Sequence, residues 1–201
     1  MEQKTILVLF KGLGGFESAF ITDSNYCIIT VDIEPAFEPT LVWDISKHES
    51  LIRAIEAMDL PNDGRIDIIL ASPPCVEFYK VAAPWFEDYY GKVPSMDLVK
   101  STMAIIDHFK PPIYIIENTK HGKKWICEEI GDIRHKIGPY YLWGEFKKFN
   151  AIVKPKGVWD SLSSADPLRS ALRAKLPLTF SQALKDTLEN QRSILDFIDL
   201  G

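Results

Sequence analysis

Short apolar runs alternate along this chain with segments in which apolar residues recur every three or four positions. The short runs predict buried strands at residues 5–10, 26–32, 41–45, 66–70 and 113–116, followed by two later strands at 138–144 and 150–153. The periodic segments predict helices at residues 16–20, 51–58 and 95–109, and a last helix that starts near a capping box at residues 179–182. Strands that alternate with helices predict a parallel sheet covered by helices, in the α/β class.

Length and composition fit one such domain. The chain has 201 residues and 46% hydrophobic content, which is enough for one well-buried core. No apolar run reaches the length of a membrane span, and the first residues do not resemble a signal peptide. The three cysteines are odd in number and lack metal-ligand spacing. We therefore expect a single cytoplasmic domain over residues 1–201 with no membrane contact, no disulfide and no metal site.

Basic residues are concentrated in one segment. The net charge is −5, yet residues 120–156 hold nine basic side chains against four acidic ones. Such a strip on an acidic body would suit an edge that contacts phosphates. A solvated lysine face is the commoner explanation, and the sequence leaves both interpretations open.

Two predicted strands lead into groups that suit a nucleoside. The strand at 5–10 runs into Gly12, Gly14 and Gly15, and glycines between a strand and a helix let the backbone approach a ligand closely. The strand at 26–32 ends in Asp32, whose carboxylate would accept hydrogen bonds from both ribose hydroxyls. A simple tight turn and a capping carboxylate are the alternatives. Asp44 repeats the pattern at the end of the third strand.

The central strand at 66–70 leads to a cysteine. Pro73 and Pro74 fix an extended backbone there, so Cys75 would lie on a stiff loop at the carboxyl end of the sheet, where open α/β sheets bind ligands. A small buried cysteine beside a turn is the alternative. The next strand, at 113–116, ends in Glu117 and Asn118, and a capping carboxylate is the alternative there.

Residues 76–96 are rich in aromatic side chains and lack a regular apolar pattern, which predicts a long loop. Loops of this length in compact domains are usually functional or mobile. Aromatic residues such as Tyr79 and Trp85, interleaved with Lys80, suit stacking on nucleic-acid bases. A satellite hydrophobic cluster is an equally good interpretation.

Taken together, these motifs are similar to those of the C5-cytosine DNA methyltransferases. That family carries a Phe-x-Gly-x-Gly-Gly loop, a Pro-Cys loop and a Glu-Asn-Val strand end in the order found here over residues 5–120. Further on, the Tyr-Tyr-Leu-Trp-Gly-Glu-Phe stretch and Arg173-Ala174-Lys175-Leu176-Pro177 resemble compact phage and archaeal members. The resemblance implies a Rossmann-like class I S-adenosylmethionine-dependent methyltransferase, in the cytoplasm of a prokaryotic or phage-infected cell.

The resemblance also implies residue roles. The S-adenosylmethionine pocket would be lined by Phe10, Gly12, Leu13 and Gly14, with Asp32 on the ribose and with Asp44 and Ile45 on the adenine. Pro74 would shape the loop, Cys75 would be the nucleophile, Glu117 would face the target base, and Asn118 would hold the loops together. The thiolate would add to cytosine C6, so that C5 becomes nucleophilic enough to accept a methyl group.

This chain departs from the family pattern at several positions. Val8 stands where Asp is usual, Val76 where Gln is usual, Tyr79 where Ser is usual and Thr119 where Val is usual. A Gln-x-Arg-x-Arg motif is missing, and the stand-ins for its base or phosphate contacts are Arg169, Arg173 and Lys175.

The chain also has no room for a target-recognition domain, so selectivity would be low or would come from short loops, a partner subunit or a homodimer. DNA is the expected substrate, with RNA or modified nucleotides as alternatives. Two other functions stay open: an exocyclic-amino (N4 or N6) methyltransferase that uses Ser72-Pro73-Pro74, and a non-catalytic accessory subunit that keeps the fold.

Overall fold

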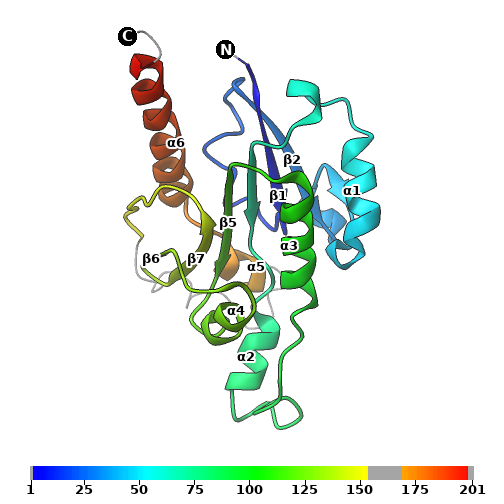
Figure 1. Cartoon of the computed structure of the whole chain (residues 1–201). Coiled ribbons are helices and arrows are strands. Elements are labelled where there is room, and N and C mark those ends of the chain that lie inside the picture. The colour runs from blue at the N-terminus through cyan, green and yellow to red at the C-terminus, as the bar shows by residue number, and fades with distance from the viewer. Residues whose placement is uncertain (1, 154–168, 199–201) are drawn as a thin grey trace.

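The computed structural model describes the backbone of residues 2–153 and 169–198, and the side chains of residues 2–153, 171–172 and 174–190. The described chain forms a helix-covered sheet, as the alternation of patterns predicts (Figure 1). Within these residues no helix is both long and apolar enough to cross a membrane.

Seven strands form one sheet in the order β3-β2-β1-β4-β5-β7-β6. Five of them are parallel: β1 (Lys4–Leu9), β2 (Tyr26–Asp32), β3 (Leu41–Val42), β4 (Ile68–Ala71) and β5 (Ile113–Asn118). The last two, β6 (His135–Ile137) and β7 (Tyr140–Glu145), form a hairpin whose β7 strand runs antiparallel to β5. The strand order reverses between β1 and β4, and ligands of open α/β sheets bind at such a switch point.

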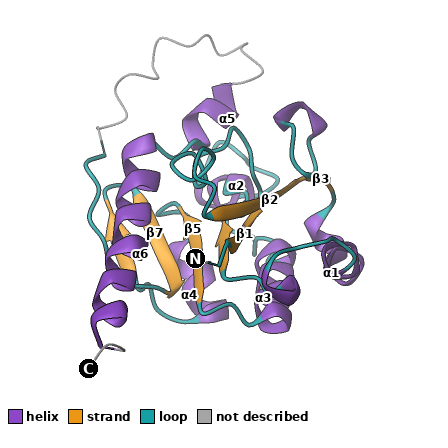
Figure 2. Ribbon diagram, turned by 90° about the horizontal axis from the view of Figure 1, so that it is seen from above, coloured by secondary structure: helices purple, strands orange, loops and turns teal. Residues whose placement is uncertain are grey.

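Helices cover both faces of the sheet. One face packs against α1 (His48–Glu56), α3 (Asp97–Phe109) and α4 (Lys123–Ile130), and the other against α6 (Leu178–Ile198). Figure 2 shows α6 separated from α1 and α3 by the strands. Two shorter helices, α2 (Val76–Ala82) and α5 (Arg169–Ala174), lie at the end of the sheet where β4 and β5 finish (Figure 1).

The predicted helix at residues 16–20 is wrong. These residues form turns, with Phe16 and Phe20 buried against α6. Ala19 N donates to Ser181 Oγ at 3.0 Å, and that hydroxyl donates in turn to the Phe16 carbonyl. The Ser181 hydroxyl of α6 therefore forms hydrogen bonds with two backbone groups that would bond to each other's neighbours if residues 16–20 were a helix.

Five other features differ from the prediction. Residues 150–153 form no strand, whereas β6 at His135–Ile137 was not foreseen. The expected loop at 76–96 begins with α2, and β3 ends at Val42 instead of residue 45. The capping box is also wrong, because α6 already begins at Leu178 and Thr179 Oγ1 donates to the Ile152 carbonyl at 2.8 Å.

Candidate active site

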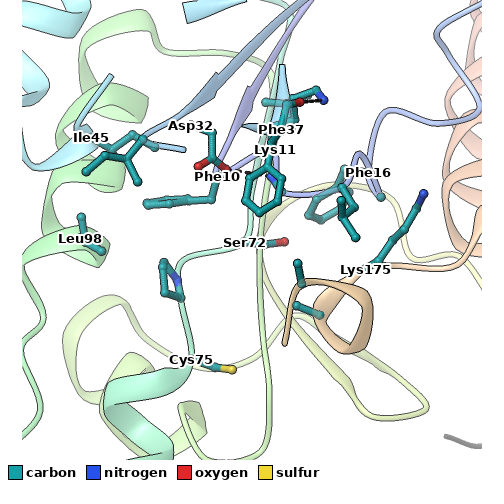
Figure 3. Close-up of a pocket in the computed structure, with 18 of the residues that line it drawn as sticks. Phe10, Lys11, Phe16, Asp32, Phe37, Ile45, Ser72, Cys75, Leu98 and Lys175 are labelled. Carbon is teal, nitrogen blue, oxygen red and sulfur yellow. Dashed lines mark hydrogen bonds between the residues drawn. The ribbon is translucent and has the colours of Figure 1, made fainter. Parts of the chain in front are cut away.

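A cavity of about 570 Å³ opens at the carboxyl ends of β1, β2 and β4. Figure 3 shows Ile45 and Leu98 on one side of it, Phe16 and Lys175 on the other, and Cys75 below. Its wall includes most of the residues expected to bind a nucleoside, together with the thiol-bearing loop: Phe10, Gly12, Leu13, Asp32, Asp44, Ile45, Pro74 and Cys75. Gly14, which was expected there too, is not part of this wall.

The loop after β1 is shaped by left-handed backbone conformations. Phe10 has φ 61°, Gly12 has φ 52° and Gly14 has φ 71°. A non-glycine residue at positive φ is uncommon and concentrates at functional sites. No atom lies within 4 Å of where a Cβ at Gly12 would stand, so a ligand can approach this backbone closely.

Asp32 ties this loop to the end of β2. The Gly12 N–H donates to Asp32 Oδ2 at 2.8 Å, and the Glu34 N–H donates to Asp32 Oδ1 at 2.9 Å. The side chain is nearly buried and still belongs to the cavity wall. Each carboxylate oxygen keeps a further lone pair, so Asp32 is able to accept hydrogen bonds from a ligand as well.

Asp44 combines a structural role with a place in the cavity wall. Its Oδ1 accepts hydrogen bonds from the Ser46 hydroxyl at 2.7 Å and the Ser46 N–H at 3.0 Å, and so caps the short helix at Ile45–Lys47. These two bonds lower the pKa of Asp44. The group is therefore an ionised acceptor at neutral pH.

A C-terminal segment closes the cavity from the α6 side. A Cβ on Gly15 would lie 2.6 Å from the Leu176 backbone nitrogen, so Gly15 and Leu176 are in close contact. Lys175 and Leu176 both belong to the cavity wall, as do Ala171 and Ala174 of α5. Lys175, which was expected to contact substrate, thus lies beside the glycine loop.

The Cys75 loop is held by its neighbours. Asn118 Nδ2, on β5, donates to the Pro73 carbonyl at 2.9 Å, while Asn118 Oδ1 accepts from the Thr119 N–H at 2.8 Å. Cys75 then occupies the position just before α2, half-buried, with its side chain in the cavity wall. Asn118 therefore joins the end of β5 to the loop that carries the thiol.

Glu117 lies on the other face of β5 from Asn118, because side chains alternate along a strand. It is 7% exposed and pairs in register with Leu142 of β7. The β4–β5 register sets Ala71 beside Ile116, so the Cys75 loop and Glu117 leave the sheet at adjacent strand ends. Glu117 itself is not part of the cavity wall.

The aromatic residues after Cys75 form an exposed cluster. Tyr79 makes edge contacts with Trp85, Phe86 and His121, with ring centroids 6.1, 5.9 and 5.5 Å apart. Lys80 Nζ lies 4.6 Å from the centre of the Tyr89 ring. Trp85 remains 69% exposed. The segment is thus both a hydrophobic cluster and an accessible aromatic surface, so the two interpretations left open by the sequence do not exclude each other.

A sequence model of the C-5 cytosine-specific DNA methylases matches residues 5–124, which is more than half of the chain. This chain belongs to the C-5 cytosine-specific DNA methylase family. The resemblance noted in the sequence motifs is thereby confirmed, and with it the Rossmann-like methyltransferase fold, whose seven-stranded sheet is seen here.

Two known proteins are similar to this chain. The Type II methyltransferase M1.HphI of Haemophilus parahaemolyticus is 24% identical over 123 residues, which are 57% of this chain and 32% of the relative. A solved structure of the Entamoeba histolytica methyltransferase EhMeth has a TM-score of 0.49 and 17% identity, over 77% of this chain and 56% of that one. This chain therefore spans about a third of the curated relative.

The residues at which this chain departs from the family motifs lie in different parts of the structure. Val8 and Val76 both belong to the cavity wall, where each presents an apolar surface. Tyr79 belongs to the aromatic cluster. Of the three proposed cationic stand-ins, only the side chain of Lys175 is described; those of Arg169 and Arg173 lie outside the described residues. The described residues include no cluster of His, Cys, Asp or Glu that would hold a metal ion.

Glu17 is a buried acid that the sequence interpretation missed. It is 1% exposed, neither carboxylate oxygen has a hydrogen-bond partner among the described residues, and one of them lies 3.1 Å from where a Cβ on Gly14 would stand. Burial raises the pKa of Glu17, an effect that its own nearby backbone N–H and the charges of Lys11 and Lys175 only partly offset. No sequence motif distinguishes it from an ordinary surface acid after a glycine turn.

Replacing Glu17 with glutamine is expected to stabilise the folded chain at neutral pH by roughly 1 kcal/mol, because it removes a buried charge. A raised folded pKa means that the stability linked to Glu17 is present below the unfolded pKa and is lost as pH rises through the folded pKa. Thermal unfolding of Glu17→Gln and wild type should therefore differ at pH 8 and converge at pH 4. If Glu17→Gln unfolds at the same temperature as wild type at pH 8, the prediction is contradicted.

Proposed function

We propose that this chain transfers a methyl group from S-adenosylmethionine to C5 of cytosine in DNA, through a covalent bond between Cys75 and C6. The observation that carries the proposal is that one cavity wall contains both the nucleoside-type groups of the glycine loop and Asp32, and the side chain of Cys75. A cofactor and a nucleophile are useful together only when both reach the same reacting atoms.

The residues present fit S-adenosylmethionine. The open backbone at Gly12 leaves room for the ligand beside Phe10 and Leu13, and the Asp32 carboxylate would accept the ribose hydroxyls. The adenine would lie toward Ile45 and Asp44. Lys175, on the opposite side of the cavity in Figure 3, would face the carboxylate of the methionine end. When bound, S-adenosylmethionine supplies an electrophilic methyl group on a sulfonium.

Each of four residues in this chain would have its own role in the reaction. The Cys75 thiolate would add to C6 of the cytosine, which turns C5 into an enamine-type nucleophile. Glu117 would hold a proton toward N3 and so stabilise the electrons displaced onto the ring. After C5 has gained its methyl group and S-adenosylhomocysteine has been released, a base would remove the C5 proton, the Cys75–C6 bond would break to regenerate the thiolate, and the proton at N3 would return to Glu117. Pro74 and Asn118 would keep the loop in place throughout.

Cytosine in a duplex must leave the base stack before Cys75 can reach C6, at a cost of about a few kcal/mol. The exposed aromatic cluster begins with Tyr79 in α2, directly after Cys75, continues to Trp85, and would stack on bases next to the flipped cytosine. Lys80 would contact phosphates there.

Site selectivity would be low, or would come from short loops, a partner subunit or a second copy of this chain. As proposed, residues 1–201 form one catalytic domain without a target-recognition domain, and the curated relative is about three times as long as the part that matches.

Incubation with tritiated S-adenosylmethionine and unmethylated duplex DNA of mixed sequence, followed by mass spectrometry of the digested nucleosides, tests this function. We expect 5-methylcytosine as the product, and a parallel reaction with RNA checks the substrate class. N4-methylcytosine or N6-methyladenine would overturn the proposed mechanism in favour of exocyclic-amino transfer. Cofactor binding without transfer would favour an accessory subunit.

Replacing Asp32 with asparagine is expected to weaken S-adenosylmethionine binding at least about tenfold. Both oxygens of Asp32 accept backbone N–H bonds, so an amide NH₂ would oppose one of these donors as well as lose a ribose contact. Titration calorimetry measures the change, and Asp63→Asn, in an exposed turn outside the cavity wall, is the matched control. Wild-type affinity in Asp32→Asn would rule out the ribose assignment.

A further inference from the structure

Tyr140 stands beside Glu117 on the neighbouring strand. In the antiparallel β5–β7 pair, Glu117 is opposite Leu142, and Tyr140 comes two residues before Leu142. Residues two apart on a strand share a face, so Tyr140 and Glu117 project from the same side of the sheet. Such diagonal neighbours are about 7–8 Å apart at the backbone, which an aromatic side chain spans. Tyr140 also lies at the strand end where β5 finishes.

The Tyr140 ring is anchored while its side chain stays half-buried. Its ring makes an edge contact with Phe180 of α6 at 5.5 Å between centroids, and Phe180 is fully buried. Burial and the nearby Glu117 carboxylate raise the pKa of Tyr140 to about 12. The hydroxyl therefore keeps its proton at neutral pH and is available as a hydrogen-bond donor.

We propose that, once a cytosine is bound, the Tyr140 hydroxyl donates a hydrogen bond to one oxygen of Glu117 and so aims the other oxygen at N3 of that cytosine. This inference rests on the proposed function. A carboxyl group has two oxygens, and a donor on one of them selects the rotamer in which the second faces the base. No proton is transferred in this contact, so Tyr140 is a positioning residue and Glu117 remains the group that touches the substrate.

Tyr141 provides a matched control. It is the adjacent tyrosine, is also half-buried, and pairs with Asn118, so it projects from the opposite face of the sheet. Its ring lies under Lys136 Nζ at 5.2 Å and Lys123 Nζ at 6.0 Å instead of beside Glu117. Removing either hydroxyl leaves the ring and its packing in place, so the two variants differ mainly in which face loses a donor.

The experiment compares Tyr140→Phe, Tyr141→Phe and wild type in kcat, in KM for S-adenosylmethionine and in unfolding temperature. We expect Tyr140→Phe to lower kcat by about tenfold or more, with that KM and the unfolding temperature unchanged, because only the orientation of Glu117 is lost. Tyr141→Phe should stay within about twofold of wild type.

Wild-type kcat in Tyr140→Phe, or equal losses in both variants, would overturn the role of Tyr140 while methyl transfer by wild type still stands. A lowered unfolding temperature that accounts for the loss in Tyr140→Phe would overturn it too. Absence of methyl transfer in wild type would instead contradict the proposed function itself, and the role of Tyr140 with it.

Discussion

Replacing Cys75 with alanine is expected to abolish methyl transfer to DNA, with a loss of at least about a thousandfold, because C5 of cytosine is not nucleophilic until a thiolate has added at C6. Cofactor affinity should change little. The loop is held by the Asn118 bond to the Pro73 carbonyl and by the Ser72 N–H bond to the Leu9 carbonyl, neither of which uses the sulfur atom. Calorimetry and a filter-binding assay for tritiated DNA measure the two quantities.

Cys127→Ala is the control for this experiment. Cys127 is another half-buried cysteine that forms no disulfide; it belongs to α4, packs against the core and is not part of the cavity wall. Its replacement should leave methyl transfer within about twofold of wild type. Substantial labelling of DNA by Cys75→Ala, or a comparable loss in both variants, would remove the basis for a cysteine nucleophile at this position.

Replacing Gly15 with alanine is expected to lower both the stability of the fold and the affinity for S-adenosylmethionine. The new Cβ would lie 2.6 Å from the Leu176 nitrogen and 3.2 Å from its Cα. Backbone atoms cannot rotate away, so the segment at Lys175 and Leu176 has to move out of the cavity wall. Overpacking of this kind costs about 1–3 kcal/mol. Cofactor binding should weaken in addition, because the moved residues line the site.

Gly91→Ala separates this steric effect from a general intolerance of alanine. Gly91 lies in an exposed loop, and no atom stands within 4 Å of where its Cβ would be, although its φ of 73° adds some backbone strain. We expect unchanged cofactor affinity in this variant. Thermal unfolding and calorimetry on both variants decide the matter, and wild-type values in Gly15→Ala would contradict the close packing of Leu176 on the glycine loop.

The ends of the strands can be predicted from the sequence because they are determined by residues in the same short segment. Continuous apolar runs predict β1, β2, β4 and β5, and the residue that follows each run occupies the carboxyl edge of the sheet. This places Asp32 and Cys75 in one region without any knowledge of tertiary contacts. Two prolines similarly predict the extended exit from β4, since they restrict the backbone whatever surrounds them.

Other features depend on partners far away in the chain. The helix predicted at 16–20 fails because Ser181, more than 160 residues later, takes its backbone groups. The place of Leu176 against Gly15 depends on how α6 docks, and that of Tyr140 beside Glu117 depends on the register of β7. The local pattern of apolar residues cannot predict these long-range contacts. The burial of Glu17 also follows from the packing of the turn and not from its sequence.

The covalent bond between Cys75 and cytosine is the central claim, and DNA containing 5-fluorocytosine tests it directly. A base can remove a proton from C5 but cannot remove fluorine, so the bond between Cys75 and C6 should persist after methyl transfer. We expect a denaturant-stable complex that forms only with S-adenosylmethionine present, maps to Cys75 by peptide mass spectrometry, and is lost in Cys75→Ala. Methylation of ordinary cytosine without any such complex, or an adduct on Cys27 or Cys127, would contradict the account.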